Sequence, residues 1–539
     1  MATLQDYLGI TKLRDAWPKW KANVVAVNNQ VIAHIAGTAD KHLTSHVIND
    51  SEEAGTTTAD AINTNKAKVA DHVAGTADKH SAQDITYTGD FTGKTEVKAA
   101  LDQAKTEIDT IVISASIDPE VALARESLVK AKTFATIDAR FEESEQDLVS
   151  YQTETTALIN SINPWQIYGY KIDEANSNPE TAVTYMLESV GKTPATAGDG
   201  ASESWDATPI YNELKYCMFK NGVVNYYLDP LDITKKEDGV TPADITTGAD
   251  GDVMVEFPQL WWKMNKANAE IYAYLSKTKG DINFEAPAHT VGNTIKNKIY
   301  ISVYPGIIIG GKLRSLSGHI PTASETIGTF RIAAQANGLG YQQFGYYQWL
   351  MLQHLFYLRF KDRDSQVALG RGYTELDVIK ATGDTNAQAG LYYGTTSDQV
   401  SMKCFGIEAL WGYQVTWTDG LFSDAERNIL IGDQTVYNDN GAGYANYGQG
   451  ATENISGYTG TVQGGTETGF IIKTADGSST TRFADYGFLV ASRVANSGGD
   501  RANGAHAGIG RLYALHSGAE VDATIGGRLV FVGEDNDIS

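Results

Sequence analysis

Histidines occupy equivalent places in a repeated phrase near the start of the chain. The phrase HIAGTADKH, which begins at His34, returns as HVAGTADKH, which begins at His72. Histidines are common metal ligands, but zinc sites usually combine closely spaced histidines with cysteines. Here seven residues separate the two histidines of each copy, and no second type of ligand accompanies them. We therefore predict two copies of a small structural unit without a bound metal.

Other short motifs typical of enzymes are incomplete. GIIIGGKL (Gly306–Leu313) nearly matches a phosphate-binding loop, but Leu313 stands where Ser or Thr would bind magnesium. The sequence contains neither a GxSxG nucleophile elbow nor an HExxH zinc motif. Two cysteines, Cys217 and Cys404, are too few for a disulfide framework or a zinc cluster. We predict no cofactor and no catalytic residue, although the 66 acidic residues leave open a carboxylate pair that hydrolyses glycosidic bonds.

The segment between Asn496 and His516 is rich in glycine and alanine, with larger polar and aromatic side chains spaced along it. Small residues let the backbone turn tightly and leave larger neighbours exposed, as a contact surface needs. Arginine and tyrosine are also residue types whose truncation often weakens binding. The predicted binding residues are Asn496, Asp500, Arg501, Asn503, His506, Arg511, Tyr513 and His516.

Charge and hydropathy exclude two classes of partner. With 43 basic and 66 acidic residues the formal net charge is −23, whereas sequence-independent binding of nucleic acid needs clustered Lys and Arg. No run of 18 apolar residues occurs, so we expect no membrane insertion. The first residues lack the basic and apolar pattern of a secretory signal, and we expect a soluble protein made in a cytoplasm.

The elements that must position these residues differ between the two parts of the chain. Before residue 164 only Trp17 and Trp20 are tryptophans, and Ala, Thr, Asp and Lys are frequent. The other seven tryptophans, nearly all tyrosines and most glycines follow. This composition predicts a thin stalk that carries a compact head.

Residues 118–163 are predicted to form one long helix. Asp118 and Pro119 are typical of a helix start, and neither glycine nor proline interrupts the segment that follows. Apolar residues recur at heptad a and d positions, with Ser144 and Thr155 as polar steps. Aromatic residues at a positions favour more than two strands, so we predict a homotrimeric coiled coil; the alternative is a helix packed on its own domain. The predicted seam consists of Phe134, Ile137, Phe141, Leu148, Tyr151, Leu158 and Ile162.

The back part reads mainly as short strands. Short segments in which apolar and polar residues alternate are separated by the turn residues Gly, Asn-Pro and Asp-Gly, a pattern typical of hairpins. Gly345–Phe360 is apolar on more than one face and predicts a buried helix. Strands are predicted at Gly487–Val494 and Gly527–Val532, and the residues between them are expected to form a long display loop.

Several phrases of the back part resemble those of known families. YKIDEANSNPE, DGDVMVEFPQLWW and GGKLRSLSG resemble the heads of phage tail and receptor-binding proteins, and AGTADKHSAQDITYTGD resembles tail-fibre segments. FGIEALWGYQVTWTDG with GGRLVF resembles the C-type-lectin-like fold and, more narrowly, the variable proteins of diversity-generating retroelements, such as phage tropism determinants. Gly412–Trp417 matches only part of their motif. The resemblance covers most of residues 164–539 and, more loosely, 30–95.

Together these features predict an α+β, multi-domain chain with a helical N-terminal stalk, a trimeric coiled coil, a β-rich insert and a C-terminal C-type-lectin-like domain. The resemblance implies a tail-fibre or baseplate protein of a phage or phage-like particle, located in the virion. It would bind other tail or baseplate proteins and adsorb to a host cell-surface receptor, either glycan or protein. The alternative is a fibre-borne glycosidase or depolymerase that degrades host polysaccharide. The predicted domains are 1–92 (particle attachment), 93–163 (stalk), 164–290 (β-rich shoulder) and 291–539 (receptor-binding head).

Overall fold

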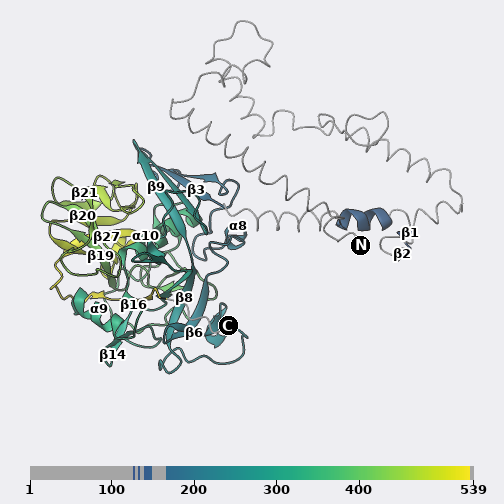
Figure 1. The fold of residues 1–539 in the computed structure, drawn as a ribbon, viewed down its shortest axis with the longest axis horizontal. Coiled ribbons are helices and arrows are strands. Elements are labelled where there is room, and N and C mark those ends of the chain that lie inside the picture. The colour runs from purple at the N-terminus through teal and green to yellow at the C-terminus, as the bar shows by residue number, and fades with distance from the viewer. Residues whose placement is uncertain (1–125, 128–131, 134–138, 148–165, 534–539) are drawn as a thin grey trace, which may run out of the picture. The chain divides into compact units, whose positions relative to one another are not determined.

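Figure 1 shows the computed structural model of the chain. The chain forms two compact units, Met1–Tyr151 and Gln152–Ser539. The described part of the second unit is β-rich with few helices, which confirms the prediction of a β-rich C-terminal region. The structure describes residues 126–127, 132–133, 139–147 and 166–533.

The described residues of the first unit correct the prediction of one unbroken helix over 118–163. β1 (Glu126–Ser127) and β2 (Lys132–Thr133) pair as antiparallel strands. A continuous helix cannot contain such a pair. Thr133 is β-branched and loses side-chain freedom in a helix, which favours the extended conformation.

A helix spans residues 139–147 and carries one residue of the predicted seam. Phe141 is 43% exposed in the single chain, so its ring is available to another chain. The hydroxyl of Ser144 donates to the carbonyl of Arg140 (2.8 Å), so this polar residue of the predicted seam has a hydrogen-bond partner within its own helix. The predicted attachment region 1–92 lies outside the described residues, as do Phe134, Ile137, Leu148, Tyr151, Leu158 and Ile162.

A four-stranded antiparallel sheet begins the second unit, with strand order β4-β3-β10-β9. Side chains alternate along β10, so Ile271, Ala273 and Leu275 are buried whereas Tyr272 and Tyr274 are half-buried. One face of the sheet therefore packs on the core and the other faces solvent. The strands are β3 (Tyr168–Asp173), β4 (Val183–Leu187), β9 (Trp261–Ala267) and β10 (Glu270–Ser276).

A seven-stranded sheet joins segments from both sides of residue 290, in the order β16-β29-β13-β8-β5-β6-β7. β8 (Asp252–Pro258) pairs directly with β13 (Lys298–Ser302), which places Glu256 opposite Tyr300. The predicted boundary between 164–290 and 291–539 therefore crosses one continuous sheet. The other strands are β5 (Lys215–Lys220), β6 (Val223–Asp229), β7 (Asp232–Lys236), β16 (Tyr341–Gln343) and β29 (Leu529–Phe531).

An eight-stranded sheet contains the predicted binding segment. Its order is β21-β20-β19-β26-β27-β25-β22, and β28 (Ile525–Gly526) pairs with β19 in parallel. Trp417 of β19 is fully buried. The remaining strands are β19 (Val415–Ser423), β20 (Asn428–Ile431), β21 (Ala445–Gln449), β22 (Ile455–Tyr458), β25 (Tyr486–Leu489), β26 (Arg493–Gly498) and β27 (Gly508–His516).

The strand predicted at Gly487–Val494 is divided in the structure. β25 ends at Leu489 and β26 begins at Arg493, and between them Ser492 takes a left-handed backbone conformation (φ 58°) that interrupts the extended chain. The residues predicted as one long display loop contain most of β26 and all of β27. The closing strand is present as β29.

The longest helix in the described part of the second unit is α10 (Tyr346–Phe360), which confirms the helix predicted there. Gly345 is its N-cap, and the helix ends where Lys361 becomes left-handed (φ 55°). Every residue of α10 except Tyr347 is buried. In Figure 1 α10 lies between β27 and β3, and it contacts both strands. The other helices are α8 (Glu203–Asp206), η1 (Pro287–His289), α9 (Ile327–Gln335), α11 (Ser365–Ala368) and η2 (Gly504–His506).

Short antiparallel pairs complete the unit, and one of them explains GIIIGGKL. β14 (Ile307–Ile309) and β15 (Lys312–Arg314) form a hairpin in which Gly310 and Gly311 both have positive φ (58° and 78°). Two consecutive positive φ values are typical of a tight hairpin turn. The segment is therefore a hairpin and not a strand–loop–helix phosphate site. The other pairs are β11 (Thr290–Val291) with β12 (Thr294–Ile295), β17 (Lys403–Cys404) with β18 (Ile407–Glu408), and β23 (Thr461–Val462) with β24 (Ile472–Thr474).

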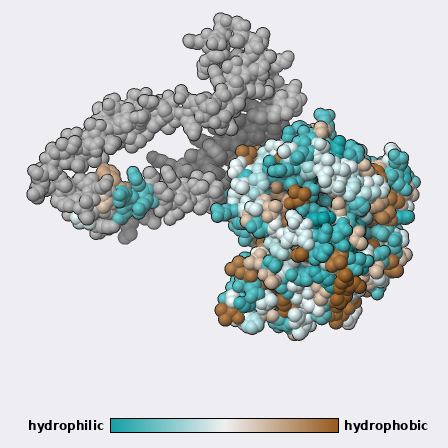
Figure 2. All heavy atoms as spheres, turned by 180° about the vertical axis from the view of Figure 1, so that it is seen from behind, coloured by the Kyte–Doolittle hydropathy of each residue, from teal (hydrophilic) through white to brown (hydrophobic). Residues whose placement is uncertain are grey.

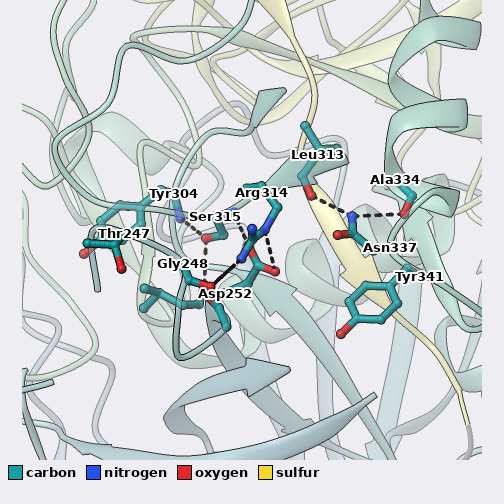
Figure 3. A network of polar contacts seen from close by, with 12 residues as sticks. Thr247, Gly248, Asp252, Tyr304, Leu313, Arg314, Ser315, Ala334, Asn337 and Tyr341 are labelled. Atoms are coloured by element: carbon teal, nitrogen blue, oxygen red, sulfur yellow. Dashed lines mark hydrogen bonds and ion pairs between the residues drawn. The ribbon is translucent and has the colours of Figure 1, made fainter. Parts of the chain in front are cut away.

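A polar network anchors this hairpin to β8 (Figure 3). The Arg314 Nε donates to the Asp252 carboxylate (2.9 Å), and its Nη2 donates to the carbonyls of Gly248 and Gly251 (3.2 Å each). The backbone N–H of Ser315 donates to the same carboxylate (2.7 Å). Asp252 is buried, so these donors offset the loss of its hydration.

Candidate functional site

The predicted binding segment lies in the middle of the eight-stranded sheet, where β25, β27 and β26 are neighbours. Phe488 of β25 is paired with Tyr513 of β27, and Tyr513 is paired with Asn496 of β26. Residues directly opposite each other on adjacent strands project to the same face of a sheet. These three side chains therefore share one face.

Aromatic rings from β22, β25, β27 and η2 meet on this face. The ring centroids of Tyr486 and His506 are 4.4 Å apart, and Tyr458 lies 5.2 and 5.3 Å from them. Phe488 and Tyr513 meet edge to face at 4.4 Å. We call Tyr458, Tyr486, Phe488, His506 and Tyr513 the aromatic surface; Tyr513 is buried and the other four are half-buried. Partly exposed rings offer both apolar area and stacking faces to a partner.

Two polar side chains lie buried beside the aromatic surface. The guanidinium of Arg511 lies over the ring of Tyr513, 3.8 Å from its centroid, and Asn496 is the cross-strand partner of Tyr513. Among the described residues, the Asn496 Oδ1 and Nδ2 and the Arg511 Nε and Nη1 have no hydrogen-bond partner. Buried polar atoms normally have a partner, and each one left without it costs about 1–3 kcal/mol. These four atoms mark a place where water or a bound group would be stabilising.

Two side chains of the aromatic surface, His506 and Tyr513, are held in their neutral forms. Burial and the neighbouring Arg511 guanidinium lower the pKa of His506. Burial raises the pKa of Tyr513, and Arg511 opposes that rise. At neutral pH His506 and Tyr513 are therefore uncharged, and the Arg511 guanidinium lies beside them.

A buried carboxyl group supports the start of β27. Asp485, which precedes β25, accepts a hydrogen bond from the backbone N–H of Gly510 through Oδ2 (2.7 Å). Burial raises the pKa of Asp485 well above its ordinary value. A Cβ at Gly510 would lie 2.8 Å from the Asp485 Oδ2, so this close approach requires glycine. The contact fixes β27 against β25 and so positions Arg511 and Tyr513.

The segment between β26 and β27 folds back on the protein through its own polar groups. Arg501 Nε donates to Asp377 Oδ1 (2.6 Å), and the Arg501 backbone N–H donates to the Tyr413 carbonyl (3.1 Å). The Asp500 carboxylate accepts from the backbone N–H of Ala502 (2.8 Å), and the Asn503 side chain accepts from the N–H of Asp500 (3.1 Å). These side chains hold the segment in place.

Neither the models of known protein families nor the curated proteins give a match to this chain. Among the described residues, no three His, Cys, Asp or Glu side chains are grouped so that they could hold a metal ion. In the same part of the chain, no helix combines the length and the apolar character that crossing a membrane requires.

The structure brings part of the predicted binding set together and corrects the rest. The expectation that these larger side chains stand clear of the surface is wrong for five of the eight, because β26 and β27 are inner strands of the sheet and the segment after β26 is folded against the protein. His516 lies apart, with its Nδ1 2.8 Å from Glu520 and its ring 5.8 Å from that of Trp417. Asn503, His506 and His516 are half-buried. The buried members are Asn496, Asp500, Arg501, Arg511 and Tyr513.

Three members of the aromatic surface were missed by the sequence analysis. Tyr486 and Phe488 alternate with Gly487 and Leu489 along β25, which is the pattern of a strand with one outward aromatic face. This signal was available in the sequence. Tyr458 comes from β22, 28 residues before Tyr486, and only the pairing of β22 with β25 brings it to the surface.

The combined change Arg501→Ala and Tyr513→Ala should destabilise the second unit. Loss of a buried aromatic ring costs about 3–5 kcal/mol, and loss of a hydrogen bond to a charged group costs about 1.5–3 kcal/mol. Urea unfolding followed by tryptophan fluorescence should therefore show a clearly lower midpoint, and Tyr513→Phe, which keeps the ring, should remain much nearer to the wild type. A double variant as stable as the wild type would contradict the packing described above.

Proposed function

We propose that this chain is a receptor-binding protein of a phage tail fibre or baseplate, and that a C-type-lectin-like head adsorbs to a host cell-surface receptor. The observation that carries the proposal is the aromatic surface with two buried, incompletely paired polar side chains beside it. His506 and Tyr513 of this surface, and the polar Asn496 and Arg511 beside it, belong to the glycine-rich C-terminal segment whose residues pointed to contact with a partner. Aromatic rings that are carried by paired strands of a sheet are suited to binding, since the strands hold the rings rigidly.

The lectin-like assignment is supported by where the resembling phrases lie. FGIEALWGYQVTWTDG supplies β18 and most of β19, and GGRLVF supplies β29. Arg528 of the second phrase donates to the carbonyls of Glu408 (2.9 Å) and Ala409 (3.2 Å) in the first. The two phrases are thus joined by direct hydrogen bonds into one framework.

The proposed mechanism is reversible adsorption through identical surfaces on a homotrimer. Each surface would bind its receptor weakly, and simultaneous binding would raise the overall affinity by about 10²–10⁴-fold. The N-terminal region would attach the trimer to other tail or baseplate proteins of the virion.

The double change Tyr486→Ala and His506→Ala should weaken cell binding by at least about 30-fold, because aromatic anchors at a binding surface are often worth 2 kcal/mol or more each. The fluorescently labelled full-length chain would be tested by flow cytometry against a panel of bacteria. Tyr274→Ala, which removes a half-buried ring from the four-stranded sheet, is the matched control and should bind like the wild type.

Melting curves of both variants check that each still folds. A folded double variant that binds cells like the wild type would overturn the assignment of the receptor site to the aromatic surface. Release of reducing ends from a purified surface polysaccharide by the wild-type chain would instead favour the fibre-borne glycosidase.

A further inference from the structure

A buried arginine beside the aromatic surface has no ion-pair partner. Arg511 is 4% exposed, and its Nε and Nη1 lack a hydrogen-bond partner among the described residues. In the same part of the chain no Asp or Glu side chain forms an ion pair with it. Arginine is the side chain best suited to bind carboxylate and phosphate groups, and its burial is unfavourable without such a partner. An anion at this place would therefore be stabilising.

The two buried carboxyl groups near Arg511 and Tyr513 do not supply that anion. Burial raises the pKa of Asp485 well above its ordinary value, which favours its neutral form, and its Oδ2 accepts from the backbone N–H of Gly510. The Asp500 carboxylate accepts from the backbone N–H of Ala502. Both carboxyl groups thus serve the local backbone.

A second polar side chain is buried beside the same ring. Asn496 is 0% exposed, stands opposite Tyr513 in the sheet, and has no partner among the described residues for either amide atom. Its amide group can both donate and accept hydrogen bonds. A hydroxyl group has the same two capacities, so Asn496 is suited to bond a hydroxyl next to an anion that Arg511 binds.

The half-buried rings add flat apolar area to these polar groups. Tyr458, Tyr486 and His506 contact one another by ring packing. The apolar face of a sugar ring can pack on such side chains. On the face that Figure 2 displays, hydrophilic and intermediate residues in teal and white cover more of the surface than apolar residues in brown, which suits a hydrated polymer. Hydroxyls, apolar ring faces and an anionic group occur together in acidic glycans.

We propose that the aromatic surface binds a glycan that carries a carboxylate or phosphate group, and that Arg511 bonds this anion while Asn496 bonds a neighbouring hydroxyl. The anion would enter beside His506, whose half-buried ring lies near Arg511 and has no hydrogen bond among the described residues. Entry requires this side chain to turn aside. The inference rests on the proposed function, because it names the chemical class of the receptor.

Binding to defined polymers tests the anion. The full-length chain would be applied to immobilised polygalacturonate, poly(glycerol phosphate), and polygalacturonate whose carboxyl groups have been reduced. At least one anionic polymer should bind about tenfold or more tightly than the reduced polymer, because hydrogen bonds to charged groups are the stronger ones. The formal net charge of −23 opposes nonspecific attraction of a polyanion, so this preference would report a local site. The polymer that binds identifies carboxylate or phosphate as the anion. Equal binding to all three polymers, or binding to neither anionic polymer, overturns the inference.

Replacing Arg511 with methionine separates a binding role from a structural one. Arg511→Met should lower binding to the preferred polymer by about tenfold or more, yet leave the midpoint of urea unfolding no lower than that of the wild type, because an apolar side chain replaces a buried group without a partner. Arg493→Met, at a half-buried arginine of β26, is the matched control and should bind normally. A folded Arg511→Met variant that binds the polymer like the wild type overturns the role of Arg511.

A measurement on the wild type needs no variant. The preferred polymer should raise the melting temperature of the chain, since a ligand that binds only the folded state stabilises it, and the reduced polymer should not. The same polymer should displace the labelled chain from the bacteria that it binds. If the chain binds bacteria and neither anionic polymer competes, adsorption stands and the anionic glycan is overturned. If the labelled chain binds none of the bacteria in the panel, the proposed function itself fails.

Discussion

Replacing Arg528 with methionine should lower the free energy of unfolding of the head by about 3–5 kcal/mol, the usual cost of removing one partner of a buried charge arrangement. Arg528 is 1% exposed, and its guanidinium donates to four backbone carbonyls. Two of these, Ser302 and Val303, belong to or follow β13, and the other two, Glu408 and Ala409, belong to or follow β18. One side chain thus joins the seven-stranded sheet to the segment that leads into β19.

The electrostatic surroundings of Arg528 increase the expected loss. Burial lowers the pKa of Arg528 to about 9. This value is still above neutral pH, so the group stays charged, and the nearby Glu408 carboxylate stabilises that charge. Glu408 is itself buried and accepts from the backbone N–H groups of Gly383 and Thr385 (2.8 Å each). Without Arg528, the buried Glu408 carboxylate would lose one of the positive charges near it, Lys403 being the other, and four carbonyls would lose a donor.

Urea unfolding followed by tryptophan fluorescence measures the effect. Arg493→Met, at a half-buried arginine of β26 that donates to the Ser492 carbonyl, is the control and should change stability by no more than about 1 kcal/mol. Arg528→Lys should fall between the two, since lysine keeps the charge but lacks the planar fork of donors. An Arg528→Met variant as stable as the wild type would show that the four carbonyl contacts contribute little.

The second large effect is expected at Phe141, where glutamate should dissociate the predicted trimer. A homotrimer would bring three such glutamates into one layer of its core, and each buried charge without a partner is strongly unfavourable. The assembly should fall from three chains to one in light scattering at micromolar concentration. Cell binding should then weaken by about 10²–10⁴-fold, because avidity is lost.

Gln146→Glu is the matched control for this change. It adds the same charge to the same helix, at an exposed position outside the a and d seam, and should leave the trimer intact. A wild-type chain that is monomeric at micromolar concentration would contradict both the coiled coil and the avidity mechanism.

Local patterns in the sequence were sufficient for several elements of the head. The helix at Tyr346–Phe360 follows from its apolar residues and from Gly345 before it, and both features act within a few turns of chain. The closing strand β29 was also foreseen, because alternation along a strand is a local property. Of the candidate site, composition pointed only to the members that lie between Asn496 and His516.

Burial and neighbourhood at the site were decided by the tertiary structure. Arg501 and Tyr513 look like exposed contact residues in the sequence, yet both are buried in the structure. Arg501 bonds to Asp377, which lies 124 positions away in the sequence, and Tyr513 lies on β27, which pairs with β26 inside the sheet. Tyr458 joins the aromatic surface only because β22 pairs with β25. A sheet is built from contacts between distant segments, so periodicity fixes which residues alternate along a strand, while the order of strands determines which side chains meet and which remain exposed.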